Sequence, residues 1–161
     1  MSRILIVYYS ATGRTRQVAE LIQKTIGGNL VSIRTKVPYS NELLARWKDG
    51  HREVKDEILP ELNDFPVDLN QYDVIFLGTP VWWYSVALPM KKFLVTHDLS
   101  GKIIFPFLTG DNAAGNAFYD LVGSLENCFV KTGLQVRFIE NRQITSDWQI
   151  QNWAKTAVEK S

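Results

Sequence analysis

Three stretches of the chain are continuously apolar over about the length of one buried strand. They cover residues 3–9, 73–79 and 102–109, and they are rich in Ile, Val, Leu and Phe. Strands that are covered on both faces, as in a parallel sheet, carry apolar side chains at successive positions. Two weaker strand patterns occupy residues 29–35, where apolar and polar positions alternate, and residues 134–140. The pattern therefore predicts five strands.

Four other segments have helical patterns. Apolar residues recur three and four positions apart in residues 18–26, and two glycines follow that segment. Residues 89–97 begin with a proline at a position that helices tolerate, and residues 116–131 gather apolar side chains on one face. Near the end of the chain, Ser146 and Gln149 form a capping-box pattern before a fourth helix.

Strands and helices alternate along the chain, which is typical of an α/β fold with right-handed crossovers. The exception is residues 36–71, which are about twice as long as a crossover between parallel strands requires. This segment includes a charge-rich helical pattern over residues 41–58. With 161 residues and no repeat or linker, the sequence predicts a single domain over residues 1–161.

Composition narrows the class of partner. The chain has 18 Lys and Arg against 17 Asp and Glu, a net charge of +1, so nothing favours nucleic acid or an anionic membrane surface. No apolar stretch is long enough to span a membrane, and isolated histidines predict no metal site. The single cysteine, Cys128, indicates a reducing cytoplasm and a buried structural thiol on the third helix. The composition is compatible with either a monomer or a homodimer.

The first strand ends in a turn of small and hydroxyl-bearing residues that leads directly into a helix. A helix N-terminus presents unpaired N–H groups and a partial positive charge, which together bind phosphate. The hydroxyl groups of Ser10, Thr12 and Thr15 can add hydrogen-bond donors. Gly13 lets the backbone approach a ligand closely, and Arg14 can add charge or point to solvent. This combination favours a phosphate site over the alternative, a plain helix cap.

Residues 6–15, IVYYSATGRT, followed by Ala19 and Ile22, resemble the flavodoxin signature. The phosphate motifs of P-loop and dinucleotide-binding proteins do not occur. The resemblance implies a flavodoxin-like three-layer α/β fold, in which a five-stranded parallel sheet of order 2-1-3-4-5 has helices on both faces. It also implies one non-covalently bound FMN whose phosphate is held by the turn: Ser10, Ala11, Thr12, Gly13, Arg14 and Thr15.

The third strand is followed by three consecutive aromatic residues at positions 82–84. Exposing all three to solvent would be costly, whereas a flat π surface suits an isoalloxazine ring. We expect at least one of them to pack under the loop as part of the core. The segment resembles the G-x-P-x-W-W loop of a short-chain flavodoxin-like subfamily, which implies flavin ring contacts from Thr79, Pro80, Val81, Trp82, Trp83 and Tyr84.

The fourth strand ends in residues 109–116, TGDNAAGN. Small and polar side chains leave backbone amides accessible to the pyrimidine edge of a flavin, while a solvated turn is the alternative. Related proteins often have Thr-x-Gly-Gly-Ser-Gly here, and this chain departs from that pattern. The resemblance implies flavin contacts from Thr109, Gly110, Asp111 and Gly115.

The resemblance implies an FMN-binding protein that transfers electrons with a redox partner protein. Two departures from carrier flavodoxins favour a second hypothesis, an NAD(P)H-dependent two-electron reductase of a quinone or free flavin. With a net charge of +1, the chain lacks the acidic field that lowers the semiquinone/hydroquinone potential of carrier flavodoxins. We therefore expect a less negative potential for this couple. Tyr84 and Ser85 stand where carriers tend to have a flipping glycine, which disfavours a stable semiquinone. A third hypothesis is a non-catalytic FMN-binding module.

Residues 38–66 are the part of the chain with the least specific pattern. Tyr39, Trp47 and the surrounding charges suit a lid over a flavin, a docking face for a partner, or simply a charged and solvated helix. No residue is assigned as a catalytic acid or base.

Overall fold

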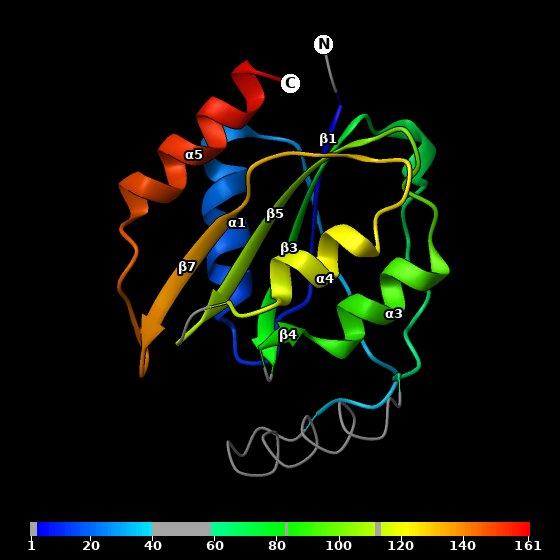
Figure 1. Ribbon diagram of the computed structural model, residues 1–161, viewed down its shortest axis with the longest axis horizontal. Coiled ribbons are helices and arrows are strands. Elements are labelled where there is room, and N and C mark those ends of the chain that lie inside the picture. The colour runs from blue at the N-terminus through cyan, green and yellow to red at the C-terminus, as the bar shows by residue number, and fades with distance from the viewer. Residues whose placement is uncertain (1–2, 40–58, 83, 112–113) are drawn as a thin grey trace.

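Five parallel strands of four or more residues form the middle layer of the structure, a computed structural model that describes residues 3–39, 59–82, 84–111 and 114–161 (Figure 1). Their order across the sheet is β2-β1-β3-β5-β7, which is the order 2-1-3-4-5 predicted for the five strands. The helical pattern over residues 41–58, and Trp47 within it, lie outside the described residues. The strands are β1 (Ile4–Tyr8), β2 (Asn29–Ser32), β3 (Val74–Trp82), β5 (Ile103–Gly110) and β7 (Leu134–Ile139).

The predicted number of five strands is too low, because three short strands bring the sheet to eight strands within the described residues. β4 (Ser85–Val86) turns back antiparallel on β3, and β8 (Arg142–Gln143) does the same on β7. β6 (Phe129–Val130) lies parallel to the first part of β5. Each of these strands has two residues, too few to produce a period-2 pattern that the sequence would reveal.

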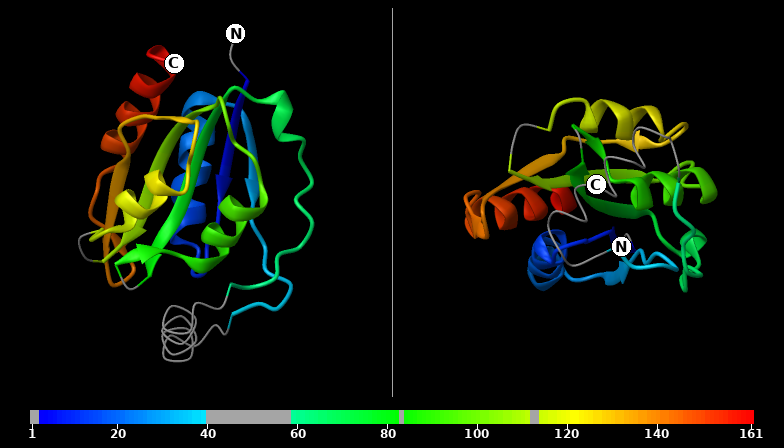
Figure 2. Two further views of the ribbon diagram at one scale, coloured as in Figure 1. Left: turned by 45° about the vertical axis from the view of Figure 1, so that its right-hand side comes forward. Right: turned by 90° about the horizontal axis from the view of Figure 1, so that it is seen from below.

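Helices cover both faces of the sheet, as predicted (Figures 1 and 2). Helices α1 and α5 lie side by side on one face, and α3 and α4 cover the other. The expected capping box of the last helix is present: the Ser146 hydroxyl accepts a hydrogen bond from the Gln149 N–H at 3.2 Å, and the Gln149 side chain accepts from the Ser146 N–H at 3.0 Å. The helices are α1 (Arg14–Ile26), α3 (Leu88–Thr96), α4 (Ala117–Gly123) and α5 (Asp147–Glu159), with a 3₁₀ turn at Leu69–Gln71.

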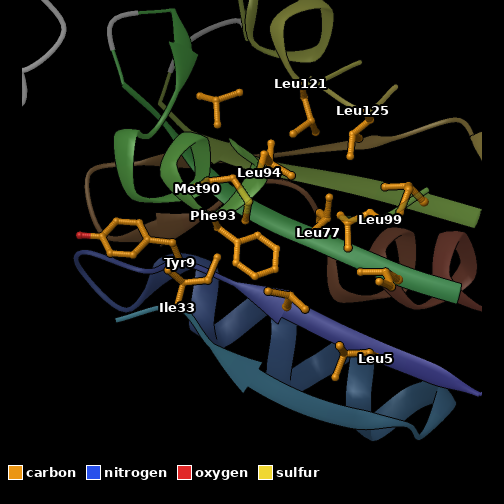
Figure 3. Packing of buried hydrophobic residues seen from close by; sticks show 14 of the residues in the cluster. Leu5, Tyr9, Ile33, Leu77, Met90, Phe93, Leu94, Leu99, Leu121 and Leu125 are labelled. Atoms are coloured by element: carbon orange, nitrogen blue, oxygen red, sulfur yellow. The ribbon is translucent and has the colours of Figure 1, made fainter. Parts of the chain in front are cut away.

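The core has a part on each side of the sheet, and successive residues of a strand enter different parts. In β1, Leu5 packs on the side of α3 and α4, whereas Ile6 packs on the side of α1 and α5. Figure 3 shows the first of these two parts, where Leu77 of β3 lies close to Met90 and Phe93 of α3. Side chains alternate between the faces of a strand, so burial of both faces explains the continuous apolar runs. Across the described ranges, no helix combines the length and apolarity needed to cross a bilayer.

The predicted helix over residues 116–131 is too long, because α4 ends at Gly123. The chain then turns through Asn127, which has a left-handed φ of 60°, and residues 129–130 join the sheet as β6. An aromatic and a β-branched residue suit a strand, and here their pairing with β5 overrides the helical pattern.

Cys128 accordingly lies in the turn before β6 and not on a helix. Its thiol donates a hydrogen bond to the Leu99 carbonyl at 3.1 Å and is partly buried. Burial, and to a lesser extent the charge of Asp98, raise the pKa of the thiol above its ordinary value. The thiolate, which is the reactive form, is therefore disfavoured.

Gly78 in β3 is predicted to be essential for stability, because a Cβ atom built on it would lie 2.2 Å from the ring of Phe107, which is fully buried. We expect Gly78→Ala to lower the free energy of unfolding by about 2–3 kcal/mol through overpacking, as measured by urea denaturation. Gly123→Ala is the matched control, since no atom lies within 4 Å of its built Cβ. That control should leave stability unchanged or raise it by about 0.5 kcal/mol. Equal effects of both substitutions would contradict the packing argument.

Candidate functional site

Three loops follow the carboxyl ends of β1, β3 and β5, at the lower edge of the sheet in Figure 1. Parallel strands bring these ends to one edge, which is where open α/β sheets bind ligands. We call residues 10–15 the first loop, residues 79–85 the second loop and residues 109–116 the third loop. Together they contain every site residue that the sequence predicted.

The first loop leads into α1 through Gly13, whose φ of 96° lies in the left-handed region that favours glycine. The Ser10 hydroxyl accepts a hydrogen bond from the Gly13 N–H at 3.0 Å. Among the described residues, no side chain caps the N-terminus of α1. The Ser10 hydroxyl thus binds the N–H of the residue just before α1, while no described side chain caps the helix itself. Thr12 is exposed beside Gly13, and Ala11 is partly buried against the core.

A buried hydroxyl pair joins the first loop to the third. The Thr15 Oγ1 atom lies 2.7 Å from the Thr109 Oγ1 atom, and each residue is only 1% exposed. One hydroxyl donates to the other, so the accepting hydroxyl keeps its own hydrogen for a further acceptor. This pair fixes the start of α1 against the end of β5.

The sequence left open whether Arg14 adds charge to the phosphate site or points to solvent. In the structure its guanidinium group contacts other groups of the protein. Its Nη1 atom lies 2.6 Å from a carboxylate oxygen of Asp111 in the third loop. Its Nη2 atom donates to the Glu140 carbonyl in the turn between β7 and β8. The guanidinium carbon lies 5.2 Å from the centre of the Phe138 ring. Three partners from outside the first loop thus hold this side chain.

The neighbouring Arg16 contrasts with Arg14. It forms an ion pair with Glu20 within α1 at 2.8 Å, and both side chains are exposed. The hydrogen bond to Glu20 raises the pKa of the guanidinium further above neutral pH. Arg16 therefore belongs to the solvated face of the helix.

The second loop is largely a β-hairpin, which corrects the expectation that the strand ends at Thr79. β3 continues to Trp82, and β4 pairs back so that Val81 faces Val86. The Thr79 hydroxyl is buried and donates to the Pro80 carbonyl at 3.0 Å. Antiparallel pairing stiffens a segment that its Pro and aromatic content marked as a loop. Trp83, one of the predicted ring contacts, lies outside the described residues.

Trp82 belongs to an aromatic cluster, defined here as Tyr9, Tyr39 and Trp82. The rings meet edge to face, with centroids 5.8 Å apart for Tyr9 and Trp82 and 5.2 Å apart for Tyr39 and Trp82. Trp82 is partly buried and packs against the core part under α3 and α4. This confirms that at least one aromatic residue of the second loop packs beneath it. Tyr9 and Tyr39 were not predicted site residues, although Tyr9 directly precedes the first loop.

Tyr84 occupies the turn of the hairpin with a left-handed φ of 62°, and its side chain is exposed. Its carbonyl accepts a hydrogen bond from the Asn116 N–H at 3.0 Å. A Cβ atom on Gly115 would lie 2.6 Å from the Tyr84 Cβ, so only glycine fits there without a shift. The Ser85 hydroxyl donates to the carboxylate of Asp120 in α4 at 2.5 Å. The second loop is thus fastened to the third loop and to α4.

The third loop is held against its neighbours by the side chains of Thr109 and Asp111. Thr109 is buried, and a Cβ atom built on Gly110 would lie 3.6 Å from the Val81 Cβ of the hairpin, an ordinary contact distance. Asp111 is exposed but paired with Arg14, and Gly115 is exposed with a left-handed φ of 59°. Residues 112–113 lie outside the described part of the chain.

A separate cavity of about 310 Å³ opens along the edge strand β2, away from the three loops. It lies between β2, the segment at residues 62–66 and the end of α3, where Phe65 packs on Phe93 and His97. No described residue of the three loops lines it. Its walls are Leu30, Val31, Ser32, Ile33, Arg34, Leu62, Asn63, Asp64, Phe65, Pro66, Phe93 and His97.

Two curated relatives of this chain carry different names. An NAD(P)H dehydrogenase (quinone) of Archaeoglobus fulgidus is 29% identical over 107 residues, which cover 64% of this chain and 53% of that protein. Flavodoxin 1 of Escherichia coli K12 is 25% identical over 136 residues, which cover 81% of this chain and 63% of that protein. The chain thus spans between about half and two thirds of the length of these relatives.

Solved structures share the fold over most of the chain. A protein from Bacteroides eggerthii has a TM-score of 0.82 at 28% identity, with 98% of this chain and 99% of that chain covered. A flavoprotein from Lactobacillus acidophilus in complex with FMN has a TM-score of 0.72 at 21% identity, with 84% and 93% covered.

The family itself is shown by a profile described as Flavodoxin, which matches residues 3–157. That match covers the sheet, the helices of both faces and all three loops. This chain therefore belongs to the flavodoxin family.

Proposed function

We propose that this protein binds one FMN non-covalently and acts in electron transfer. The observation that carries the proposal is the first loop, where a left-handed Gly13 opens α1 and no described side chain caps the helix. The N–H groups at such a helix start bind a phosphate through hydrogen bonds and partial charge. Bound FMN supplies the redox chemistry, and the chain supplies binding and orientation.

The donor set of the first loop fits the phosphate end of FMN. Ser10 and Thr12 carry hydroxyl groups within three residues of Gly13, and the Thr15–Thr109 pair adds a buried hydroxyl at the start of α1. Hydrogen bonds to a charged oxygen are stronger than those between neutral groups, so each hydroxyl donor adds to the affinity for a phosphate. The phosphate-binding residues that we propose are Ser10, Ala11, Thr12, Gly13, Arg14 and Thr15, of which Arg14 acts indirectly, as argued below.

The second and third loops fit a flat ring. The hairpin presents Tyr84 in an exposed position and Trp82 as part of the aromatic cluster. Glycines at 110 and 115 let the backbone approach the polar edge of a flavin closely. The proposed ring contacts are Thr79, Pro80, Val81, Trp82, Trp83 and Tyr84, and the proposed pyrimidine contacts are Thr109, Gly110, Asp111 and Gly115.

A specific observation favours the second candidate, NAD(P)H-dependent two-electron reduction of a quinone or free flavin. The Tyr84 carbonyl is already bound by the Asn116 N–H, and its Cβ is packed against Gly115. The peptide group between Tyr84 and Ser85 therefore cannot flip when a bound flavin gains its first electron without losing this hydrogen bond. The 29% identity to the Archaeoglobus quinone dehydrogenase supports the same candidate. A redox partner protein serves the first function, and NAD(P)H with a small acceptor serves the second.

The near-neutral chain also bears on the redox potential. The net charge is +1, and the carboxylate of Asp111 is compensated by Arg14. A negative field disfavours the addition of electrons to a bound cofactor, so its absence raises the potential. We infer a less negative potential than in acidic flavodoxins.

Thr12→Ala tests the phosphate end of the proposed site. We expect this variant to bind FMN about tenfold more weakly, because a hydrogen bond to a charged group is lost, and to bind riboflavin unchanged. Quenching of flavin fluorescence on titration of the apoprotein measures both affinities. Thr132→Ala, an exposed threonine between β6 and β7 at the opposite edge of the sheet, is the control and should have no effect. If the apoprotein binds neither ligand, the proposed function is wrong.

Tyr84→Gly tests the choice between the two functions. A glycine frees the turn, because it adopts many backbone conformations and loses contact with Gly115. The second candidate predicts that the wild type loaded with FMN is reduced in a single two-electron step, and that Tyr84→Gly shows two one-electron steps in a spectroscopic titration. Asn127→Gly changes a left-handed residue with φ 60° in the turn before β6 and should behave as the wild type. Two separate steps in the wild type would instead favour an electron carrier.

A further inference from the structure

Arg14 stands in the middle of the proposed phosphate loop, yet its guanidinium group is bound elsewhere. Its two terminal nitrogens contact Asp111 and the Glu140 carbonyl, and its plane lies near the Phe138 ring. These partners belong to the third loop, to the β7–β8 turn and to β7. One N–H of each terminal nitrogen is therefore already engaged within the protein, which leaves fewer of the five guanidinium donors for a phosphate.

The Arg14–Asp111 ion pair and the Thr15–Thr109 hydroxyl pair connect the same two loops. Each pair takes one residue from the start of α1 and one from the end of β5 or just after it. The hydroxyl pair is buried, whereas the side chains of Arg14 and Asp111 are 26% and 55% exposed. The loops are thus joined by an inner neutral contact and an outer charged contact.

We propose that Arg14 is a positioning residue that clamps the first loop to the third, and that its charge compensates Asp111 and not the FMN phosphate. The inference rests on the proposed binding of FMN between these loops. By holding both loops in place before a ligand arrives, the clamp lowers the ordering cost of binding. The clamp therefore raises the affinity for the whole flavin, including the part that has no phosphate.

This assignment predicts a salt effect that a direct phosphate contact would not produce. Riboflavin lacks the phosphate and is uncharged, so salt cannot weaken its direct contacts with the protein by screening. Salt does weaken the half-exposed Arg14–Asp111 pair. We expect riboflavin to bind the wild type about twofold more weakly in high salt, and to bind Asp111→Asn with no such dependence.

The main experiment compares Arg14→Met, Asp111→Asn and the double variant, each titrated with FMN and with riboflavin. We expect each single variant to weaken both ligands by the same factor, about fivefold, and the double variant to show little further loss, since one shared contact is removed. Arg16→Met removes the neighbouring exposed arginine and should change neither affinity. Hydrogen exchange of the third-loop amides in the apoprotein should become faster in Arg14→Met and Asp111→Asn but not in Arg16→Met.

Two results would overturn the clamp. One is a large loss of FMN affinity in Arg14→Met with riboflavin unchanged, because that pattern marks a phosphate ligand. The other is tighter FMN binding in Asp111→Asn, which would mean that the carboxylate competes with the phosphate for Arg14. If Arg14→Met does not fold, Asp111→Asn and the salt dependence still decide. If the wild type binds no flavin, the proposed function fails, while the hydrogen exchange of the apoprotein still tests the clamp.

Discussion

The rest of the structure depends on the burial of the central strands on both faces. Side chains of β1 and β3 point alternately toward α3 and α4 on one side and toward α1 and α5 on the other. This arrangement requires a helix between most successive strands, and crossover helices make the strands parallel. Because parallel strands end at the same edge, the loops that follow β1, β3 and β5 meet there. The position of the site is thus a consequence of how the core is packed.

At that edge, the loops are held by a few polar contacts between residues far apart in the sequence. Thr15 meets Thr109, Arg14 meets Asp111, and the Tyr84 carbonyl meets the Asn116 N–H. Each contact joins two different loops, so these bonds fix the three loops relative to one another. Preorganisation matters for a cofactor site because a ligand binds more weakly when its binding must also order the loops of the protein.

The curated relatives that this chain resembles include proteins named Flavodoxin 1 and a protein named NAD(P)H dehydrogenase (quinone). One fold hosts different functions, so the proposed distinction between one-electron and two-electron chemistry rests on local features of the three loops. In this chain two such features stand out. The turn at Tyr84 is held by Asn116 and Gly115, and the carboxylate of Asp111 is compensated by Arg14.

The sequence by itself determined the α/β fold, the end of the first helix at its glycines, the capping box of the last helix and, through the resemblance to flavodoxins, the order of the main strands. These follow from apolar periodicity and from motifs of adjacent residues, such as residues 10–15 and the Ser146–Gln149 box. Only the tertiary structure decided that β3 continues as a hairpin, that α4 ends at Gly123, and that Arg14 faces Asp111. The physical reason is that strand pairing and contacts across 97 residues of chain depend on which elements become neighbours in space, and local patterns do not contain that information.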